Sequence, residues 1–212
     1  MKFPILVTIT IFHPFKFSVT PPWKLPFITF CKYFTGVKRQ MTEIEIRSLF
    51  MEHIETHVDS AWIFTDGSKS STGVGYGVYS RDFNCKGALP VFTSIFTAEL
   101  FAILKAIEKI VTASGIHFTV FSDSKSVLQS LSIFNSLNPL VLKIQQWVLL
   151  LSFKGVRVDF CWVPAHTGIR GNEEADKLAK VAATSLLPRS CQLLCTDFMP
   201  KIRSYVLESW QL

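Results

Sequence analysis

Residues 60–185 combine short apolar runs and helical periodicities in an order that few folds accommodate. The first apolar runs are separated by short loops rich in glycine and serine, which is typical of an antiparallel hairpin or meander. Helical patterns then alternate with two further apolar runs, as in β-α-β crossovers. The order β-β-β-α-β-α-α-β-α therefore predicts an α/β fold, a mixed sheet with helices on its faces.

The sequence also gives approximate bounds for these elements. Strands are expected at residues 61–66, 73–83, 88–92, 116–123 and 156–164. Helices are expected from Ser94 as N-cap to Ser114, at 124–131, after Pro139 and at 172–186. We divide the chain into residues 1–58, a leader that is largely unstructured or loosely docked, residues 59–186, one domain, and residues 187–212, a tail with one helix.

The leader differs from the rest of the chain in charge. Its first 42 residues carry six basic and no acidic side chains, so the net charge of +6 is a property of this segment and does not show that the domain binds nucleic acid. Lys2 and the apolar run behind it resemble the start of a signal peptide. Pro4 interrupts that run and no small-residue cleavage site follows, so we favour a leader without a targeting role.

Composition excludes several classes of protein. With 49% hydrophobic and 18% charged residues, the chain can bury a core, so wholesale disorder is excluded. No run of about 18 apolar residues is free of charge and proline, so we expect no membrane partner. Five cysteines, an odd number without any CxxC pair, argue against a disulfide framework or a structural zinc site. We favour an intracellular location, nuclear or cytoplasmic, over secretion.

Three acidic residues occupy positions where a carboxylate is costly to bury. Asp66 and Asp123 each end an apolar strand, and Glu99 lies on the apolar face of its helix. In a mixed sheet of this order the first strand and the strand after the helix are expected to be neighbours, which brings the three side chains together. Crowded carboxylates repel one another, and divalent cations relieve that repulsion. Asp176, near the start of the last domain helix, can supply a fourth ligand.

Five stretches of the sequence carry a family resemblance. They are FTDGSKS (64–70), GVGYGVY (73–79), FTAELFAI (96–103), FSDSKSVLQSL (121–131) and WVPAHTGIRGNEEADKLAK (162–180). In these stretches the chain resembles type 1 ribonuclease H, in particular the domain carried by retrotransposons that lack long terminal repeats. The resemblance implies the ribonuclease H-like fold, a five-stranded mixed sheet flanked by helices on both faces. It also implies endonucleolytic hydrolysis of the RNA strand of RNA–DNA hybrids.

The resemblance further implies the residues of the site. The metal ligands of the family fall on Asp66, Glu99, Asp123 and Asp176, and its catalytic-loop histidine falls on His166. An all-oxygen ligand set suits Mg²⁺, for which Mn²⁺ can substitute, rather than zinc. Two such ions, about 3.5–4 Å apart, can activate water and stabilise the leaving oxygen. We assign Asp66 to both ions, Glu99 and Asp123 to the ion on the nucleophile side, and Asp176 to the other.

The expected partner is an RNA–DNA hybrid. We assign hybrid contacts to Gly67, Ser68, Lys69, Ser94, Ser124, Lys125 and Asn172. Apart from the four site acids, residues 60–186 carry 12 basic and five acidic side chains, which suits a groove that binds phosphates. The sequence departs from cellular members in the loop SIFTA, which lacks paired asparagines, and in Lys125, where glutamine is common. An upstream reverse transcriptase is a further partner that the resemblance implies, and we expect a monomer.

Two other nuclease classes fail on single residues, and one further alternative stays open. A related 3′→5′ exonuclease needs a second acid where Ser68 stands, and an integrase-like enzyme needs a glutamate where Val158 stands. The open alternative is a decayed, transposon-derived domain that binds nucleic acid without cutting it. The intact set of five catalytic positions favours the active enzyme.

Overall fold

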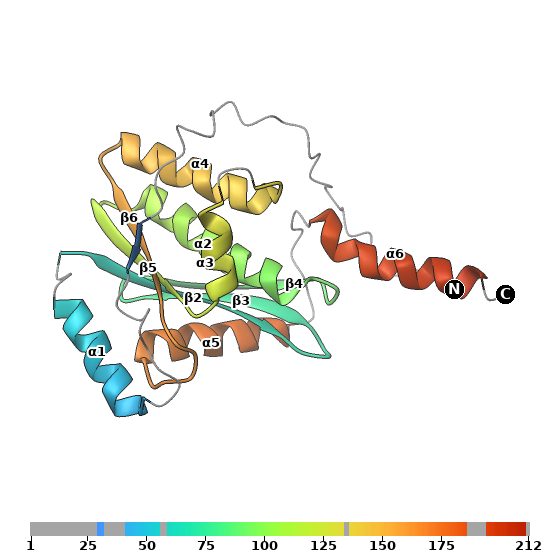
Figure 1. The fold of residues 1–212 in the computed structure, drawn as a ribbon, viewed down its shortest axis with the longest axis horizontal. Coiled ribbons are helices and arrows are strands. Elements are labelled where there is room, and N and C mark those ends of the chain that lie inside the picture. Colours follow the sequence, from blue (N-terminus) through green and yellow to red (C-terminus); the bar gives the residue numbers. More distant parts are fainter. Residues whose placement is uncertain (1–28, 32–40, 56–58, 134–135, 186–193, 211–212) are drawn as a thin grey trace.

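The structure is a computed structural model that describes residues 29–31, 41–55, 59–133, 136–185 and 194–210. Its strands are β1 (Thr29–Cys31), β2 (Ala61–Lys69), β3 (Val74–Ser80), β4 (Asn84–Leu89), β5 (His117–Ser122) and β6 (Arg157–Trp162). Its helices are α1 (Glu43–Glu55), α2 (Ile95–Thr112), α3 (Lys125–Leu131), α4 (Pro139–Phe153), α5 (Arg170–Ala183) and α6 (Cys195–Trp210). Together the strands form one sheet in the order β1-β6-β5-β2-β3-β4 (Figure 1).

Strands β2 to β6 form the predicted five-stranded mixed sheet. Strands β2, β3 and β4 are an antiparallel meander, whereas β5 lies parallel to both β2 and β6. The expected pairing of the first domain strand with the strand after the helix is thereby confirmed. Strand β2 is longer than expected, because the polar residues up to Lys69 continue its pairing with β3.

Two elements lie within the expected leader. Strand β1, which is three residues long, pairs in parallel with β6 and adds a sixth strand to the sheet. Helix α1 precedes β2, the first strand of the domain. The start of α1 is a capping box, in which the backbone N–H of Thr42 donates to the Glu45 carboxylate at 2.7 Å and the N–H of Glu45 donates to the Thr42 hydroxyl at 3.3 Å. We predicted neither element. The apolar, signal-like run at residues 3–12 lies outside the described residues.

Helices cover both faces of the sheet, as predicted. Helices α2, α3 and α4 pack on one face, and α1 and α5 lie against the other (Figure 1). On the first face α2 contributes a long apolar stripe that includes Ile103 and Ile107, both completely buried. On the second face the apolar side chains of α1 pack onto Phe64 and Phe121, whose rings stack at 4.8 Å. Among the described residues, no helix combines the length and apolar character needed to cross a membrane.

Helix α6 lies in the tail and projects away from the sheet (Figure 1). Among the side chains that the structure describes on α6, only Asp197, in the first turn, is buried. Asp197 accepts hydrogen bonds from the backbone N–H of Ser94 and the hydroxyl of Thr97, each at 3.1 Å. Phe198 packs against Phe92, with ring centroids 4.6 Å apart. The first turn of α6 therefore binds at the N-terminus of α2.

Alternate glycines of β3 let α5 lie directly on the sheet. Gly73, directly before β3, and Gly75 and Gly77 within it alternate along the chain, and a methyl group on any of them would meet backbone atoms of α5. At Gly77 the added carbon would lie 2.2 Å from the carbonyl oxygen of Ala175. The motif GVGYGVY thus sets the distance between β3 and the helix that carries Asp176.

We expect Gly77→Ala to lower the free energy of unfolding by about 1–3 kcal/mol, because the helix must move to admit the methyl group. For a chain of this size that corresponds to roughly 2–4 °C in Tm for each kcal/mol. Thermal unfolding of the variant measures the effect. Ser71→Ala, in the exposed turn before β3, is the matched control, and equal melting temperatures for the two variants would contradict the close packing of α5.

Candidate active site

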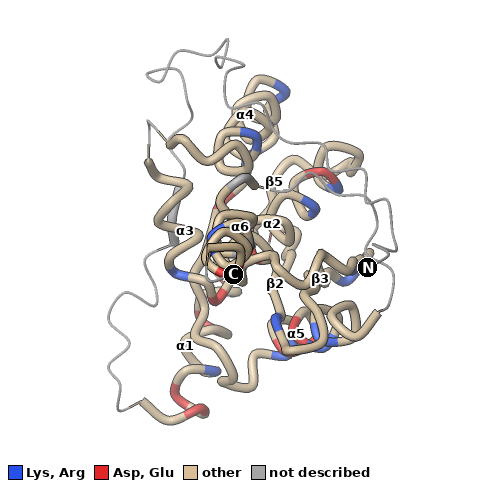
Figure 2. The backbone as a smooth tube through the Cα atoms, turned by 90° about the vertical axis from the view of Figure 1, so that its right-hand side faces the viewer, with Lys and Arg blue, Asp and Glu red and all other residues tan. Residues whose placement is uncertain are grey.

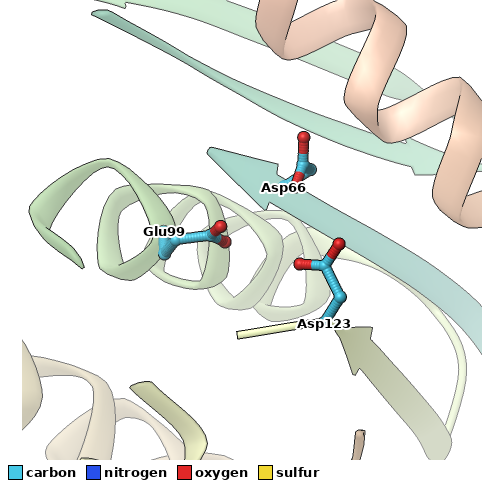
Figure 3. A group of neighbouring side chains, drawn as sticks. All are labelled: Asp66, Glu99 and Asp123. Carbon is cyan, nitrogen blue, oxygen red and sulfur yellow. The ribbon is translucent and has the colours of Figure 1, made fainter. Parts of the chain in front are cut away.

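Three carboxylates from different elements meet at one edge of the sheet. Asp66 lies on β2, Asp123 directly follows β5, and Glu99 reaches them from the second turn of α2 (Figure 3). The two aspartates become neighbours because β2 and β5 are parallel. One oxygen of each of the three side chains lies within 4.8 Å of the others, a spacing at which they can share a metal ion.

A glycine allows α2 to come this close to β2. A carbon added to Gly67 would lie 2.8 Å from the backbone nitrogen of Glu99 and 3.1 Å from Ala98. The residue after Asp66 must therefore lack a side chain. Gly67, predicted to contact the hybrid, has this structural role in the folded chain.

The electrostatics of the cluster favour the protonated acids. Asp66 and Glu99 are only 5% and 6% exposed, so their charged forms lose most of their hydration. This burial, the charges of Asp123 and Asp176 and a hydrogen bond with the Asp176 carboxyl raise the pKa of Asp66 to about 8. Burial and the charges of Asp66 and Asp123 raise the pKa of Glu99 to about 9. Burial also raises the pKa of Asp123, although a hydrogen bond from Asn172 opposes the shift.

Asp176, the fourth predicted ligand, lies beside this group. Its charge and a hydrogen bond with its carboxyl group raise the pKa of Asp66. Asp176 is nevertheless outside the set of three carboxylates whose oxygens lie within 4.8 Å of one another. Oδ2 of Asp176 accepts a hydrogen bond from Lys180 at 2.6 Å, one turn further along α5. The fourth carboxylate is thus near the cluster and paired with a lysine.

Asp123 is oriented by side chains from two other elements. The Asn172 amide donates to its Oδ2 at 3.3 Å, and the indole N–H of Trp162 donates to its backbone carbonyl at 2.9 Å. The ammonium of Lys125 lies over the Trp162 ring, 5.7 Å from the centroid. We did not assign a role to Trp162 from the sequence, although it opens the stretch WVPAH.

His166, the histidine predicted for the catalytic loop, is exposed at the start of the segment that leads into α5. His166 has a φ of 53°, the left-handed conformation, which no other non-glycine residue among those described adopts. Its charge lowers the pKa of Asp123, so the imidazole lies within electrostatic range of the cluster. The loop therefore holds His166 within electrostatic range of Asp123 and open to solvent.

The remaining predicted contact residues divide into two groups. Ser68, Ser124 and Lys125 lie near the site carboxylates in the chain and are partly or fully exposed. Lys69 and Ser94 instead stabilise the α2 end of the domain. The Lys69 ammonium donates to the carbonyl of Thr93 at 2.8 Å, and the Ser94 hydroxyl accepts from the N–H of Thr97 as the N-cap of α2.

Charges are distributed unevenly around the domain. Helix α5 carries acidic and basic side chains together, whereas α4 and the residue after it carry only basic ones (Figure 2). Lys143 and Lys154 are those basic residues. The excess of basic side chains expected from the sequence therefore does not form a dense basic patch on α4.

Comparison with known proteins agrees with this arrangement. Residues 58–184 match the sequence model of the family described as RNase H. Ribonuclease H1 of Homo sapiens is 29% identical over 144 residues, which make up 59% of this chain and 50% of the human protein. The chain thus spans half the length of this curated relative.

Proposed function

We propose that this chain, which belongs to the RNase H family, cuts the RNA strand of RNA–DNA hybrids endonucleolytically with the help of divalent metal ions. The observation that carries the proposal is the convergence of Asp66, Glu99 and Asp123 within 4.8 Å. Membership of the family supports ribonuclease H activity, and the cluster supplies the groups that such a reaction needs.

The residues of the cluster fit a hard divalent cation. All candidate ligand atoms are carboxylate oxygens, and Oε2 of Glu99 is buried without a hydrogen-bond partner among the described residues. We propose Mg²⁺, with Mn²⁺ as a substitute, and two ions held by Asp66, Glu99, Asp123 and Asp176. Bound there, the ions would lower the pKa of water and offset the negative charge of the phosphate.

The protein's own groups have distinct parts in this scheme. Asp66 is the central ligand in this proposal, because the charges of Asp123 and Asp176 act on it and its own charge acts on Glu99. Asn172 keeps Oδ2 of Asp123 in place, as groups around a metal ligand do. His166, exposed next to the carboxylates, assists proton transfer at the leaving 3′-oxygen or product departure.

Substrate binding in the proposal rests on the shape of the hybrid. We propose that 2′-hydroxyl groups in the minor groove identify the RNA strand, and that Ser68, Ser124 and Lys125 contact the backbone near the cut. The motif set further supports a retrotransposon-type domain with an upstream reverse transcriptase as partner. A monomer in the nucleus or cytoplasm is the form we propose.

The test is incubation of the full chain with an RNA–DNA hybrid labelled on the RNA strand and millimolar Mg²⁺. We expect internal cuts in the RNA strand, none in a DNA duplex, and none by the Asp123→Asn variant. Binding of the hybrid without cutting would support the decayed-domain alternative and refute the enzyme. Cleavage that persists in Asp123→Asn would refute the assigned site.

Asn172 offers a finer test of the same site. We expect Asn172→Ala to lower the rate of cleavage by about 10–100-fold, because Asp123 loses the partner that orients it. Asn84→Ala, at the exposed start of β4, is the matched control. Single-turnover cleavage rates measure the difference, and equal rates in both variants would show that the amide does not orient Asp123.

A further inference from the structure

A cavity of about 860 Å³ lies between α1, the first half of β2, the end of β3 and the start of α5. None of the site carboxylates lines it. Its volume is within the range of about 300–1,000 Å³ that is usual for small-molecule sites. Its wall is aromatic, formed by Phe50, Trp62, Phe64 and Tyr79. An aromatic lining of this kind suits a flat, unsaturated ring.

Three arginines from three different elements border the cavity. They are Arg47 of α1, Arg81 after β3 and Arg170 of α5. All three are exposed, and within the described part of the chain none forms an ion pair or a hydrogen bond. Arg157, by contrast, forms an ion pair with Asp159 at 2.9 Å. Three unpaired guanidinium groups around one hollow favour a ligand with more than one negative charge.

The remaining polar groups of the cavity fit the same ligand. The indole nitrogen of Trp62 is buried and has no hydrogen-bond partner among the described residues, so its N–H is free to donate. Helix α5 begins at the cavity, and its N-cap residue, Ile169, supplies no side-chain cap. Asp82 is the single acidic side chain among the described lining residues.

We propose that this cavity is a nucleotide site that binds a nucleoside mono- or diphosphate, with the base among the aromatic rings and the phosphates on Arg47, Arg81 and Arg170. A nucleotide satisfies both features of the cavity, whereas free phosphate leaves the aromatic wall unused. The leader of this chain is a poor occupant, because its first 42 residues carry six basic and no acidic side chains. The site is independent of hybrid cleavage.

The test is titration of the full chain with AMP or ADP by calorimetry in EDTA, so that binding at the carboxylate cluster through a metal is absent. We expect binding of the nucleotide, and at least about tenfold weaker binding of adenosine and of inorganic phosphate, because each lacks half of the contacts. Equal affinity for phosphate and nucleotide would overturn the proposal. So would an absence of nucleotide binding at millimolar concentration, or an acidic peptide that binds where nucleotides do not.

Variants locate the binding in this cavity. Arg81→Ala is expected to weaken nucleotide binding at least about tenfold, whereas Arg203→Ala, a matched exposed arginine on α6, leaves it unchanged. Asp82→Asn is expected to strengthen binding, since it removes the one acidic lining group, and a gain of affinity cannot come from misfolding. Equal affinities in Arg81→Ala and Arg203→Ala, or weaker binding in Asp82→Asn, would overturn the proposal.

Discussion

Replacement of Asp66 by asparagine is expected to lower RNA cleavage by at least about a thousandfold, which corresponds to about 4 kcal/mol of transition-state stabilisation. Asparagine has nearly the same shape but no charge, so the proposed metal site loses one anionic ligand. Single-turnover cleavage of a labelled hybrid in millimolar Mg²⁺ measures the loss. Asp59→Asn, on the exposed turn before β2, is the matched control and should cleave like the parent.

The melting temperature of Asp66→Asn distinguishes the loss of cleavage activity from misfolding of the variant. Because Asp66 is 5% exposed and lies among other carboxylates, its charge is unfavourable without metal. In EDTA at about pH 9, above the pKa of about 8 of this carboxyl, Asp66→Asn should therefore melt at the same temperature as the parent or higher. A folded Asp66→Asn variant that still cuts RNA would show that the cluster is not the catalytic site.

The strand ends explain why the cluster could be expected from the sequence. Asp66 and Asp123 each follow an apolar run, and the order β-β-β-α-β that joins them led us to expect their strands to be neighbours, as the parallel pairing of β2 and β5 shows. Side chains that follow the apolar runs of two neighbouring parallel strands lie close together. Glu99 was identifiable because a carboxylate on an apolar helix face needs a partner. Periodicity and topology are enough for these three residues.

Contacts between residues that are distant in the sequence could not be predicted in this way. Ser94 was expected to cap α2, and it does, but nothing near it in the chain indicates that Asp197, 103 residues away, accepts its backbone N–H. The same is true of Asp159, which pairs with His117 on the neighbouring strand at 2.8 Å. Such contacts depend on tertiary packing, which local patterns do not encode.

Helix α1 is an intermediate case. Its capping box, Thr42 to Glu45, is visible in the sequence, and it marks a helix start. We nevertheless placed residues 43–55 in the leader, together with the basic first 42 residues. The face that α1 buries, including Ile46 and Phe50, covers the aromatic pair on β2 and β5. The boundary of the folded unit at residue 59 stays a prediction.

Metal-free protein is expected to lose stability as pH rises. In the folded state Asp66 and Glu99 keep their protons up to a pKa of about 8 and about 9, whereas in the unfolded chain they release them near pH 4. Between these limits the folded state binds more protons, so the free energy of unfolding decreases with increasing pH. The stabilisation is complete below about pH 4 and is lost as pH passes through about 8 to 9.

Thermal unfolding in EDTA between about pH 6 and pH 9 measures this loss, which we expect to exceed about 10 °C in Tm. Millimolar Mg²⁺ should restore most of it at the alkaline end, because the cation binds the deprotonated cluster and only in the folded state. The double variant Asp66→Asn/Glu99→Gln should show a flatter pH profile and no response to Mg²⁺. If the parent instead gains stability with rising pH in EDTA, the carboxylates are ionised throughout, and the crowding of charge inferred for the cluster is wrong.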